Sequence, residues 1–377
     1  MPLNIEQVPG FIETVLKKYI KVEWNDVSLA LQEFYYASRL FDKASNDTMG
    51  GPFCEWKLQV ANPGNFQLSG PYAIDSTNRI EMMTHGNAAW SQNTTNYTFD
   101  ITEEVFKRSA EEIVNHMDVL EHAMLNDYWQ GMEDLMFSSG PANATLVPRP
   151  PFSLTWWIQA MPMTSAATTT TAGVPAYTTP GFYGGNPPGF ANCGNVDCTK
   201  YKNWSNRCFT YSQVSHDDFV NKIVESMDKC NFKPPAPYAQ LAAGKPKWEL
   251  LTTYSRIQAA RNLLQQGNDN IGSNLAEHAD GACYIRNVPM NHVPAWWNSG
   301  SINKRTDGVL LGVNWSKFKA FYAPGLRMTK RAPFQVHSPQ PMHNVRMRCM
   351  DDSNQIVCLD RRSNFIGTSL NWVTEND

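Results

Sequence analysis

The stretch TEEVFKRSAEEIVNHMDVLEHAMLNDYWQGMEDLMFSSG runs from Thr102 to Gly140 and has the pattern of one long helix. Its apolar residues recur at steps of three and four, which places them in a single stripe along a helix. Asp100 and Glu103 have the spacing of a capping box, and Gly140 provides a stop signal. A helix over residues 102–138 would be roughly 50 Å long, about twice the length of an ordinary globular helix or more. Such a rod suits a subunit that contacts its neighbours better than a protein built around a pocket.

The residues before this helix predict a long hairpin over residues 51–100. Its two flanks alternate apolar with polar residues, at Trp56, Leu58 and Val60 on one side and at Tyr97, Phe99 and Ile101 on the other. Pro-Gly and Gly-Pro pairs and an Asn-rich segment between the flanks mark an irregular tip. The alternation is weak across the middle, so we expect the hairpin to lie on a surface, where it needs a partner.

The remaining segments predict an α+β protein with mostly antiparallel strands. Residues 1–50 form an N-terminal arm with helical spacing, and residues 101–239 form a domain that holds the long helix and an irregular insertion at 160–210. A second domain covers residues 240–335. Strands are predicted at Trp248–Thr252, Cys283–Val288, Val309–Val313 and Phe318–Tyr322, and further helices at 216–230 and Tyr254–Gln266.

The C-terminal residues 336–377 predict an antiparallel hairpin that returns to the domain of the long helix. The polar sequence Asp351-Asp352-Ser353-Asn354 is typical of a turn. This turn would join strands at 343–350 and 355–361.

Charge is distributed unevenly, although the net charge of the chain is only −3. Residues 101–140 hold nine acids against two bases, whereas residues 301–362 hold eleven bases against four acids. Copies of the chain could pair these opposite patches, and two separately solvated faces would give the same count. The modest net charge excludes electrostatic nucleic-acid binding by the chain as a whole. The N-terminus lacks the pattern of a signal peptide, and no run of about 18 apolar residues exists, so no membrane partner is expected.

Cys193, Cys198 and Cys208 are weak candidates for a zinc site, with Cys230 as a fourth ligand. Structural zinc sites usually show ligand pairs with two to four residues between them. Four residues lie between Cys193 and Cys198, but the other two cysteines are solitary. These cysteines could therefore hold one zinc ion, form a disulfide bond or bind no metal. We favour no metal and no cofactor.

Two groups of residues are candidates for catalysis, and each has a structural explanation. The sequence His216-Asp217-Asp218 could supply a base with a carboxylate partner, or it could cap the following helix through Ser215 or Asp217, which we favour. His278 and Asp280 precede Cys283, which suggests a Cys/His pair. However, Cys283 opens an apolar strand, where cysteine is usually a small buried hydrophobic residue.

The parts follow one another as a short arm, an extended hairpin, a long acidic helix, a mixed domain and a closing hairpin. The most telling local sequences are PRPP (148–151) to WIQ (157–159), GF (181–182) to GF (189–190), KNW (202–204), GKPK (244–247) to TTY (252–254), and DRRSNF (360–365). In this order and over residues 55–366, the chain resembles the major capsid protein of tailed bacteriophages, which has the Hong Kong 97 type of fold.

This resemblance implies a structural protein, not an enzyme, that assembles as pentamers and hexamers into an icosahedral head around double-stranded DNA. Residues 51–100 would be the extension loop over a neighbouring subunit, residues 101–140 the spine helix of the peripheral domain, and residues 240–335 much of the axial domain. The implied partners are further copies, a portal, a decoration protein and weakly contacted DNA. Many such proteins begin with a long scaffolding region, whereas only about fifty residues precede the loop here. The resemblance therefore implies either a separate scaffold or a scaffolding segment that is missing from this sequence. The implied location is the virion, after assembly in the host cytoplasm.

The predicted subunit contacts come from the loop, the long helix and an arginine pair near the C-terminus: Trp56, Lys57, Arg79, Trp90, Glu111, Glu112, Asp118, Arg361 and Arg362. The loop has a single lysine, Lys57 near its base, so no Lys–Asn crosslink is predicted. A cytoplasmic Cys/His hydrolase and a non-viral compartment shell of the same fold are the alternative functions.

Overall fold

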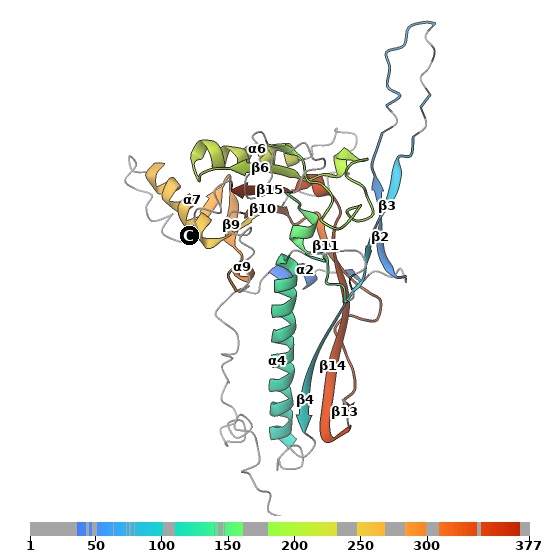
Figure 1. The fold of residues 1–377 in the computed structure, drawn as a ribbon, viewed down its shortest axis with the longest axis vertical. Coiled ribbons are helices and arrows are strands. Elements are labelled where there is room, and N and C mark those ends of the chain that lie inside the picture. Colours follow the sequence, from blue (N-terminus) through green and yellow to red (C-terminus); the bar gives the residue numbers. More distant parts are fainter. Residues whose placement is uncertain are drawn as a thin grey trace, which may run out of the picture.

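The structure is a computed structural model that describes residues 36–42, 45–46, 51–62, 64–72, 74, 77–78, 80–100, 110–138, 140–141, 146, 148–160, 180–231, 247–267, 283–298, 309–337 and 341–369. It consists of a body with two large sheets, a long helix that extends from one side of the body and a hairpin that projects from the other (Figure 1). This mixture of helices and mainly antiparallel sheets confirms the α+β class. Within the described residues, no helix combines the length and the apolar character needed to span a bilayer.

Helix α4 (Ala110–Phe137) confirms the predicted long helix over most of its length. It contains 28 residues and is therefore about 42 Å long. Its apolar stripe is buried at Met124, Tyr128, Met132 and Met136. The predicted start of the helix, including Glu103 of the capping box, lies outside the described residues.

A six-stranded sheet lies along α4. Strand β4 (Ser91–Asp100) pairs antiparallel with the long strand β14 (Pro341–Cys358), from Ser91 opposite Asn354 to Asp100 opposite Val345 (Figure 1). The other strands of the sheet are β1 (Ser45–Asn46), β11 (Phe318–Tyr322), β12 (Thr329–Lys330) and β13 (Phe334–His337). The last three pair with β14, and β1 pairs parallel with β11, so β14 is the central strand.

The predicted C-terminal hairpin is wrong, because β14 runs without a turn through residues 351–354. Polar residues that favour a turn here find partners in other segments. Asp352 accepts hydrogen bonds from the Tyr128 hydroxyl (2.5 Å) and from the Met328 backbone N–H (3.2 Å). Ser353 bonds through its backbone to the segment that precedes β12. Because these groups are satisfied by tertiary contacts, the strand can continue.

The second sheet has seven strands in the order β5-β6-β15-β10-β7-β9-β8. They are β5 (Gly181–Phe182), β6 (Arg207–Tyr211), β7 (Trp248–Thr252), β8 (Cys283–Ile285), β9 (Val288–His292), β10 (Val309–Asn314) and β15 (Phe365–Ser369). Helices α6 (Asn221–Cys230) and α7 (Tyr254–Gly267) pack on this sheet. A one-turn π-helix at His216–Val220 leads into α6.

Most predicted elements of this region are confirmed, including the strands at 248–252 and 318–322 and the helix that is α7. The single strand expected at Cys283–Val288 is wrong, because Arg286 and Asn287 adopt left-handed backbone angles (φ 54° and 61°) and turn the chain from β8 into β9. Residues 240–335 contribute to both sheets, since β7 to β10 belong to one and β11 to β13 to the other.

We call residues 51–90 the projecting hairpin. Its strands β2 (Phe53–Gln59) and β3 (Met83–Ala89) pair only with each other among the described strands, and the loop between them extends away from the body (Figure 1). The predicted hairpin is therefore confirmed for its first flank. The expected second flank at 97–101 is wrong, because β4 runs away along α4 after Trp90.

Three short helices gather around the C-terminal end of α4: α2 (Tyr36–Asp42), α5 (Leu154–Trp157) and α9 (Pro294–Asn298). One-turn 3-10 helices lie at Lys202–Trp204 and Arg361–Ser363. The segment expected as an irregular insertion at 160–210 contributes to the core in its described part, with Cys193, Cys198 and Trp204 buried. Of the predicted arm at 1–50, the described residues are 36–42 and 45–46.

Candidate assembly interface

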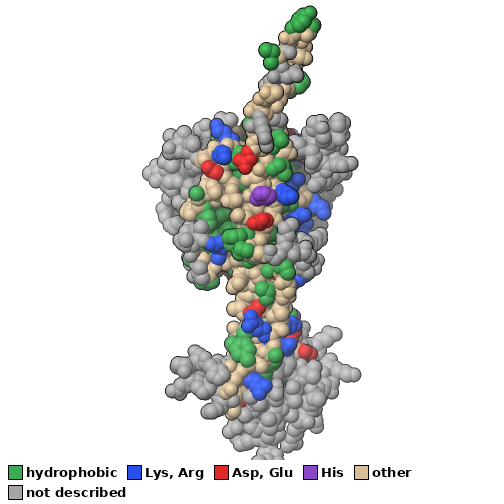
Figure 2. Space-filling model, turned by 90° about the vertical axis from the view of Figure 1, so that its right-hand side faces the viewer, with side chains coloured by type: hydrophobic (Ala, Val, Ile, Leu, Met, Phe, Trp, Pro, Cys, Tyr) green, Lys and Arg blue, Asp and Glu red, His purple; other side chains and the backbone are tan. Residues whose placement is uncertain are grey.

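The loop of the projecting hairpin carries the most exposed large apolar side chains of the described residues. Phe66, Leu68, Tyr72 and Ile74 have exposed fractions of 92%, 94%, 99% and 92%. Apolar side chains are visible at the far end of this loop, well away from the body (Figure 2). Exposed apolar surface is unfavourable in water by about 25 cal/mol per Å² and marks contact with another molecule.

Amide side chains hold the two sides of this loop together. Asn65 donates from its side chain to the carbonyl of Asn78 and accepts from the Asn78 backbone N–H, both at 3.0 Å. Further out, Gln67 donates to the carbonyl of Ile74 at 3.0 Å. The amides therefore pair across the loop, while the apolar side chains remain in solvent.

Trp56 anchors the base of the projecting hairpin to the body. Its ring lies over Gly86 on the paired strand, where a Cβ atom would be 2.3 Å from the ring. The ring centroid lies 6.0 Å from that of Trp157, with the planes at 65°. Gly194 fits beside both rings, since a Cβ there would be 2.8 Å from Trp157 and 3.2 Å from Trp56. Trp56 thus contacts Gly86, Trp157 and Gly194 of its own chain, and its role in subunit contact stays a prediction.

The substitution Gly86→Val is expected to displace the Trp56 ring and to destabilise the chain by about 1–3 kcal/mol, because the new side chain overlaps the indole. Chemical denaturation measures this change. Gly70→Ala is the matched control, since a Cβ at Gly70 meets nothing within 4 Å. Equal stability of the two variants would contradict the anchoring role of Trp56.

A loop of the body that contains Gly194 and Asn195 forms hydrogen bonds with strand β3. The carbonyl of Gly194 accepts a hydrogen bond from the Asn87 backbone N–H at 3.1 Å, and the Asn195 side chain donates to the carbonyl of His85 at 3.3 Å. Both loop residues have left-handed backbone angles (φ 60° and 65°). Glycine and asparagine tolerate such angles best, so this tight turn suits its sequence.

The other predicted contact residues of the hairpin and the helix differ in their exposure to solvent. Lys57 is exposed on β2. Trp90 is half-buried and donates its indole N–H to the carbonyl of Gly51 at 3.0 Å. Asp118 is exposed on α4. The remaining predicted positions, namely Arg79 and the side chains of Glu111 and Glu112, lie outside the described residues.

The acidic helix and the basic C-terminal strands pair within one chain. Glu121 of α4 forms ion pairs with Lys330 of β12 and with Arg348 of β14, the latter at 3.5 Å. Some of the opposite charges therefore pair within one molecule. This differs from both expected arrangements, which were pairing between copies and two separately solvated faces.

Arg361 is buried, with an exposed fraction of 1%, so the prediction that it contacts another subunit is wrong. Its guanidinium donates to four oxygen atoms: the carbonyls of Trp157 (2.7 Å), Trp204 (3.1 Å) and Gly185 (3.1 Å), and the side chain of Asn206 (3.0 Å). It also lies 2.8 Å from the sulfur of Cys198. This side chain joins three segments of the core. Arg362 is exposed and pairs with Asp360 at 3.4 Å.

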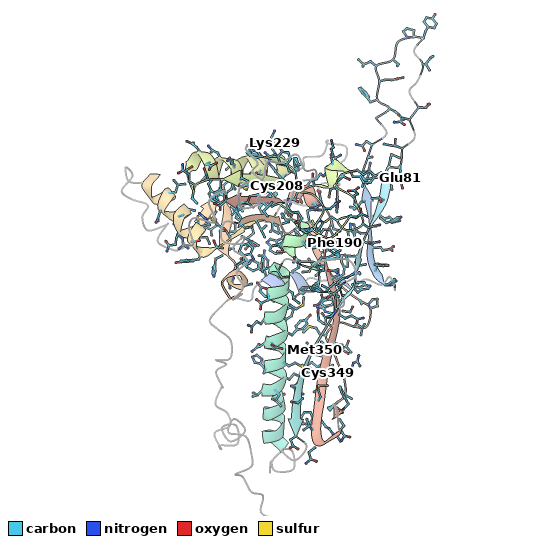
Figure 3. All side chains as sticks on the ribbon, in the orientation of Figure 1. Glu81, Phe190, Cys208, Lys229, Cys349 and Met350 are labelled. Carbon is cyan, nitrogen blue, oxygen red and sulfur yellow. The ribbon has the colours of Figure 1, made fainter. Side chains whose placement is uncertain are left out.

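The three candidate metal ligands are buried around this arginine. Burial raises the pKa of Cys193 and of Cys208 to about 12, and burial also raises the pKa of Cys198, in each case against the opposing charge of Arg361. Cys208 lies inside the body on β6 (Figure 3). Metal binding requires thiolates, which burial disfavours, and the guanidinium repels a cation. Among the described residues, no group of three or more His, Cys, Asp or Glu side chains could hold a metal ion.

Of the candidate catalytic residues, the structure describes Cys283 and His216 to Asp218. Cys283 is buried, and burial raises the pKa of its thiol, which disfavours the thiolate of a nucleophile. His278 and Asp280 lie outside the described residues. The capping interpretation of 216–218 is confirmed, because the Ser215 hydroxyl accepts a hydrogen bond from the Asp218 backbone N–H at 3.1 Å.

The sequence reasoning missed the four exposed apolar residues of the loop. The signal was present, because isolated apolar residues lie there among Gly, Pro and Asn without the alternation of a strand that buries one face. The roles of Gly86 and Gly194 had no such signal, since both depend on the position of Trp56 in three dimensions.

Comparison with known proteins identifies the fold. No protein-family profile matches the chain, and no curated protein sequence matches it. A capsid structure of the native GTA particle matches with a TM-score of 0.53 and 8% identity, over 94% of this chain and 97% of the other. Capsid structures of cyanophage A-1(L) (TM-score 0.49, 13% identity, 92% and 96% covered) and of Gordonia phage Cozz (0.48, 12%, 94% and 92%) are also similar.

The first of these structures, with a TM-score above 0.5, has the same fold as this chain. It extends over 94% of this chain and 97% of the other. The chain therefore has the capsid fold of the Hong Kong 97 type, as the resemblance in its sequence implied.

Proposed function

We propose that this chain is the major capsid protein of a tailed bacteriophage and that it assembles through the projecting hairpin. The observation that carries the proposal is the hairpin itself, in which four exposed apolar side chains extend from a base fixed by Trp56. A fold shared with a capsid protein over 94% of the chain supports the same function.

The shape of the hairpin explains how one copy would hold another. Four large apolar side chains of the loop are exposed, while Asn65 and Gln67 form hydrogen bonds across it. Contact with another copy would therefore remove apolar surface from water and leave these two amides paired. Trp56 and Gly194 fix the base, which reduces the conformational entropy that a free arm would lose on contact. The proposed assemblies are pentamers and hexamers that form an icosahedral head around double-stranded DNA.

Purified full-length chain is expected to form assemblies far larger than its 42.5 kDa mass. Mass photometry should show rings of five or six chains, and electron microscopy should show shells, either alone or with a scaffold. Only monomers or dimers under all of these conditions would contradict the proposal.

A Cys/His hydrolase is not supported, because Cys283 is buried and its thiol pKa is raised. A non-viral compartment shell would share the same contacts, and the neighbouring genes separate it from a phage head. Genes for a terminase, a portal and a protease beside this gene are expected for a phage.

The proposed partners are further copies of the chain, a separate scaffold, a portal and a decoration protein. Contacts with packaged DNA are proposed to be weak, since the net charge is −3. The proposed location is the virion, after assembly in the host cytoplasm.

A further inference from the structure

Helix α2 occupies the junction between α4 and the two sheets. The Tyr36 ring stacks on Trp315 (centroids 6.1 Å apart) and meets Phe137 edge-on at 5.4 Å. At the other end of the helix, Phe41 packs against Tyr322 of β11 with the centroids 5.6 Å apart. The short strand β1 then pairs with β11.

Glu133 of α4 forms the polar contact beneath α2. One carboxylate oxygen accepts a hydrogen bond from the Ala37 backbone N–H at 2.6 Å, and the other accepts from the Tyr36 backbone N–H at 3.4 Å. The exposed fraction of Glu133 is 0%. Both donors come from α2, so α2 lies directly against the carboxylate.

No cationic side chain among the described residues forms an ion pair with Glu133. The cation of α2, Arg39, pairs with Glu249 of β7 at 3.4 Å. The charged group that acts on Glu133 electrostatically is Asp134 on α4. On α2, the Tyr36 hydroxyl donates a hydrogen bond to the backbone carbonyl of His292 on β9 at 3.5 Å. A buried carboxylate with only backbone donors is costly as an ion.

We propose that docking of α2 on α4 is linked to a proton on Glu133, so that the docked segment holds Glu133 neutral and ionisation of Glu133 loosens α2. The proposal concerns one segment of the chain and is independent of the proposed capsid function.

The electrostatics of the site agree with this direction. Burial is the largest effect and raises the pKa of Glu133 to about 7, well above the usual value of a glutamate, against the two backbone N–H groups, which lower it. With α2 released, solvent reaches the carboxylate and its pKa returns toward the ordinary value. Between these two values the docked form binds the proton and the released form does not. Docking is therefore strongest in acid, weakens by roughly tenfold per pH unit as the pH rises toward 7, and levels off above it.

Hydrogen exchange of the full-length chain, corrected for the intrinsic effect of pH, tests the proposal at the amides of residues 36–41. Between pH 5.5 and pH 8, the protection of these amides is expected to fall by roughly tenfold or more in the wild-type chain. Glu133→Gln keeps the shape and an acceptor for Ala37 but cannot ionise, so its protection is expected to be independent of pH. Asp127→Asn, an exposed change on the same helix, is the matched control and should respond like the wild type.

Two results of the exchange experiment would overturn the proposal. A wild-type protection of residues 36–41 that does not depend on pH would overturn the proposal. An equal pH response in the wild type and in Glu133→Gln would assign the effect to another group and would also overturn it. Thermal unfolding of Glu133→Gln shows separately that the variant is folded, and Glu133→Asp serves as a second variant that still ionises.

Discussion

Replacing Phe66, Leu68, Tyr72 and Ile74 by serine is expected to abolish assembly while leaving the body folded. The four side chains are more than nine-tenths exposed, so they contribute little to the stability of an isolated chain. In an assembly, they are the largest apolar surface that the hairpin can bury, and burying each large side chain is worth about 1.5–3 kcal/mol. Losing all four contributions would remove about 6–12 kcal/mol, which is comparable to the whole binding free energy of many protein complexes.

The measurement is particle yield by electron microscopy, with circular dichroism and thermal unfolding to check the fold. The matched control replaces the same residues by similar apolar ones, as Phe66→Leu, Leu68→Met, Tyr72→Phe and Ile74→Val, and should assemble. Normal particles from the serine variant would show that the loop is not the contact that holds the copies together. Loss of assembly in both variants would indicate a requirement for shape at the loop as well as for apolar surface.

Arg361→Ala is expected to destabilise the chain by about 3–5 kcal/mol. The substitution removes the donor for four buried oxygen atoms, which lie in three segments of the chain, and it leaves a cavity where the guanidinium lay. Unsatisfied buried acceptors cost free energy because no water reaches them. Denaturant unfolding should show this change in the midpoint of the transition.

Arg362→Ala is the matched control, because the neighbouring arginine is exposed and its pair with Asp360 lies at the surface. Its effect should stay within about 0.5 kcal/mol. Similar losses in the two variants would contradict the internal role of Arg361. The stability of Arg361→Lys is expected to lie between those of Arg361→Ala and the wild type, since an ammonium group cannot reach all the same acceptors.

The long helix could be predicted because its information is local. Residues three and four apart share a helix face in any tertiary context, so the stripe that includes Met124 and Met132 identified both the helix and its buried side. The first flank of the hairpin was predictable for the same reason, since the alternation around Trp56 is a property of one strand.

Strand β14 could not be predicted, because the sequence at 351–354 has the local preference of a turn. The partners that overrule it, Tyr128 and Met328, lie more than twenty residues away in the sequence. The same holds for Arg361: a pair of arginines near the end of a chain is usually solvated, and only the packing of the segment that contains Cys198 encloses the first of them.

By itself, the sequence determined the long helix α4, the α+β class, the position of the projecting hairpin and the order of parts that resembles a capsid protein. Each of these follows from periodicity or from residues close together in the chain. Only the tertiary structure decided that β14 is one strand, that Arg361 is buried among thiols and carbonyls, and that Glu133 lies beneath α2. These features depend on hydrogen bonds and burial between distant segments, and the free energy of a polar group is set by the partners and the water around it.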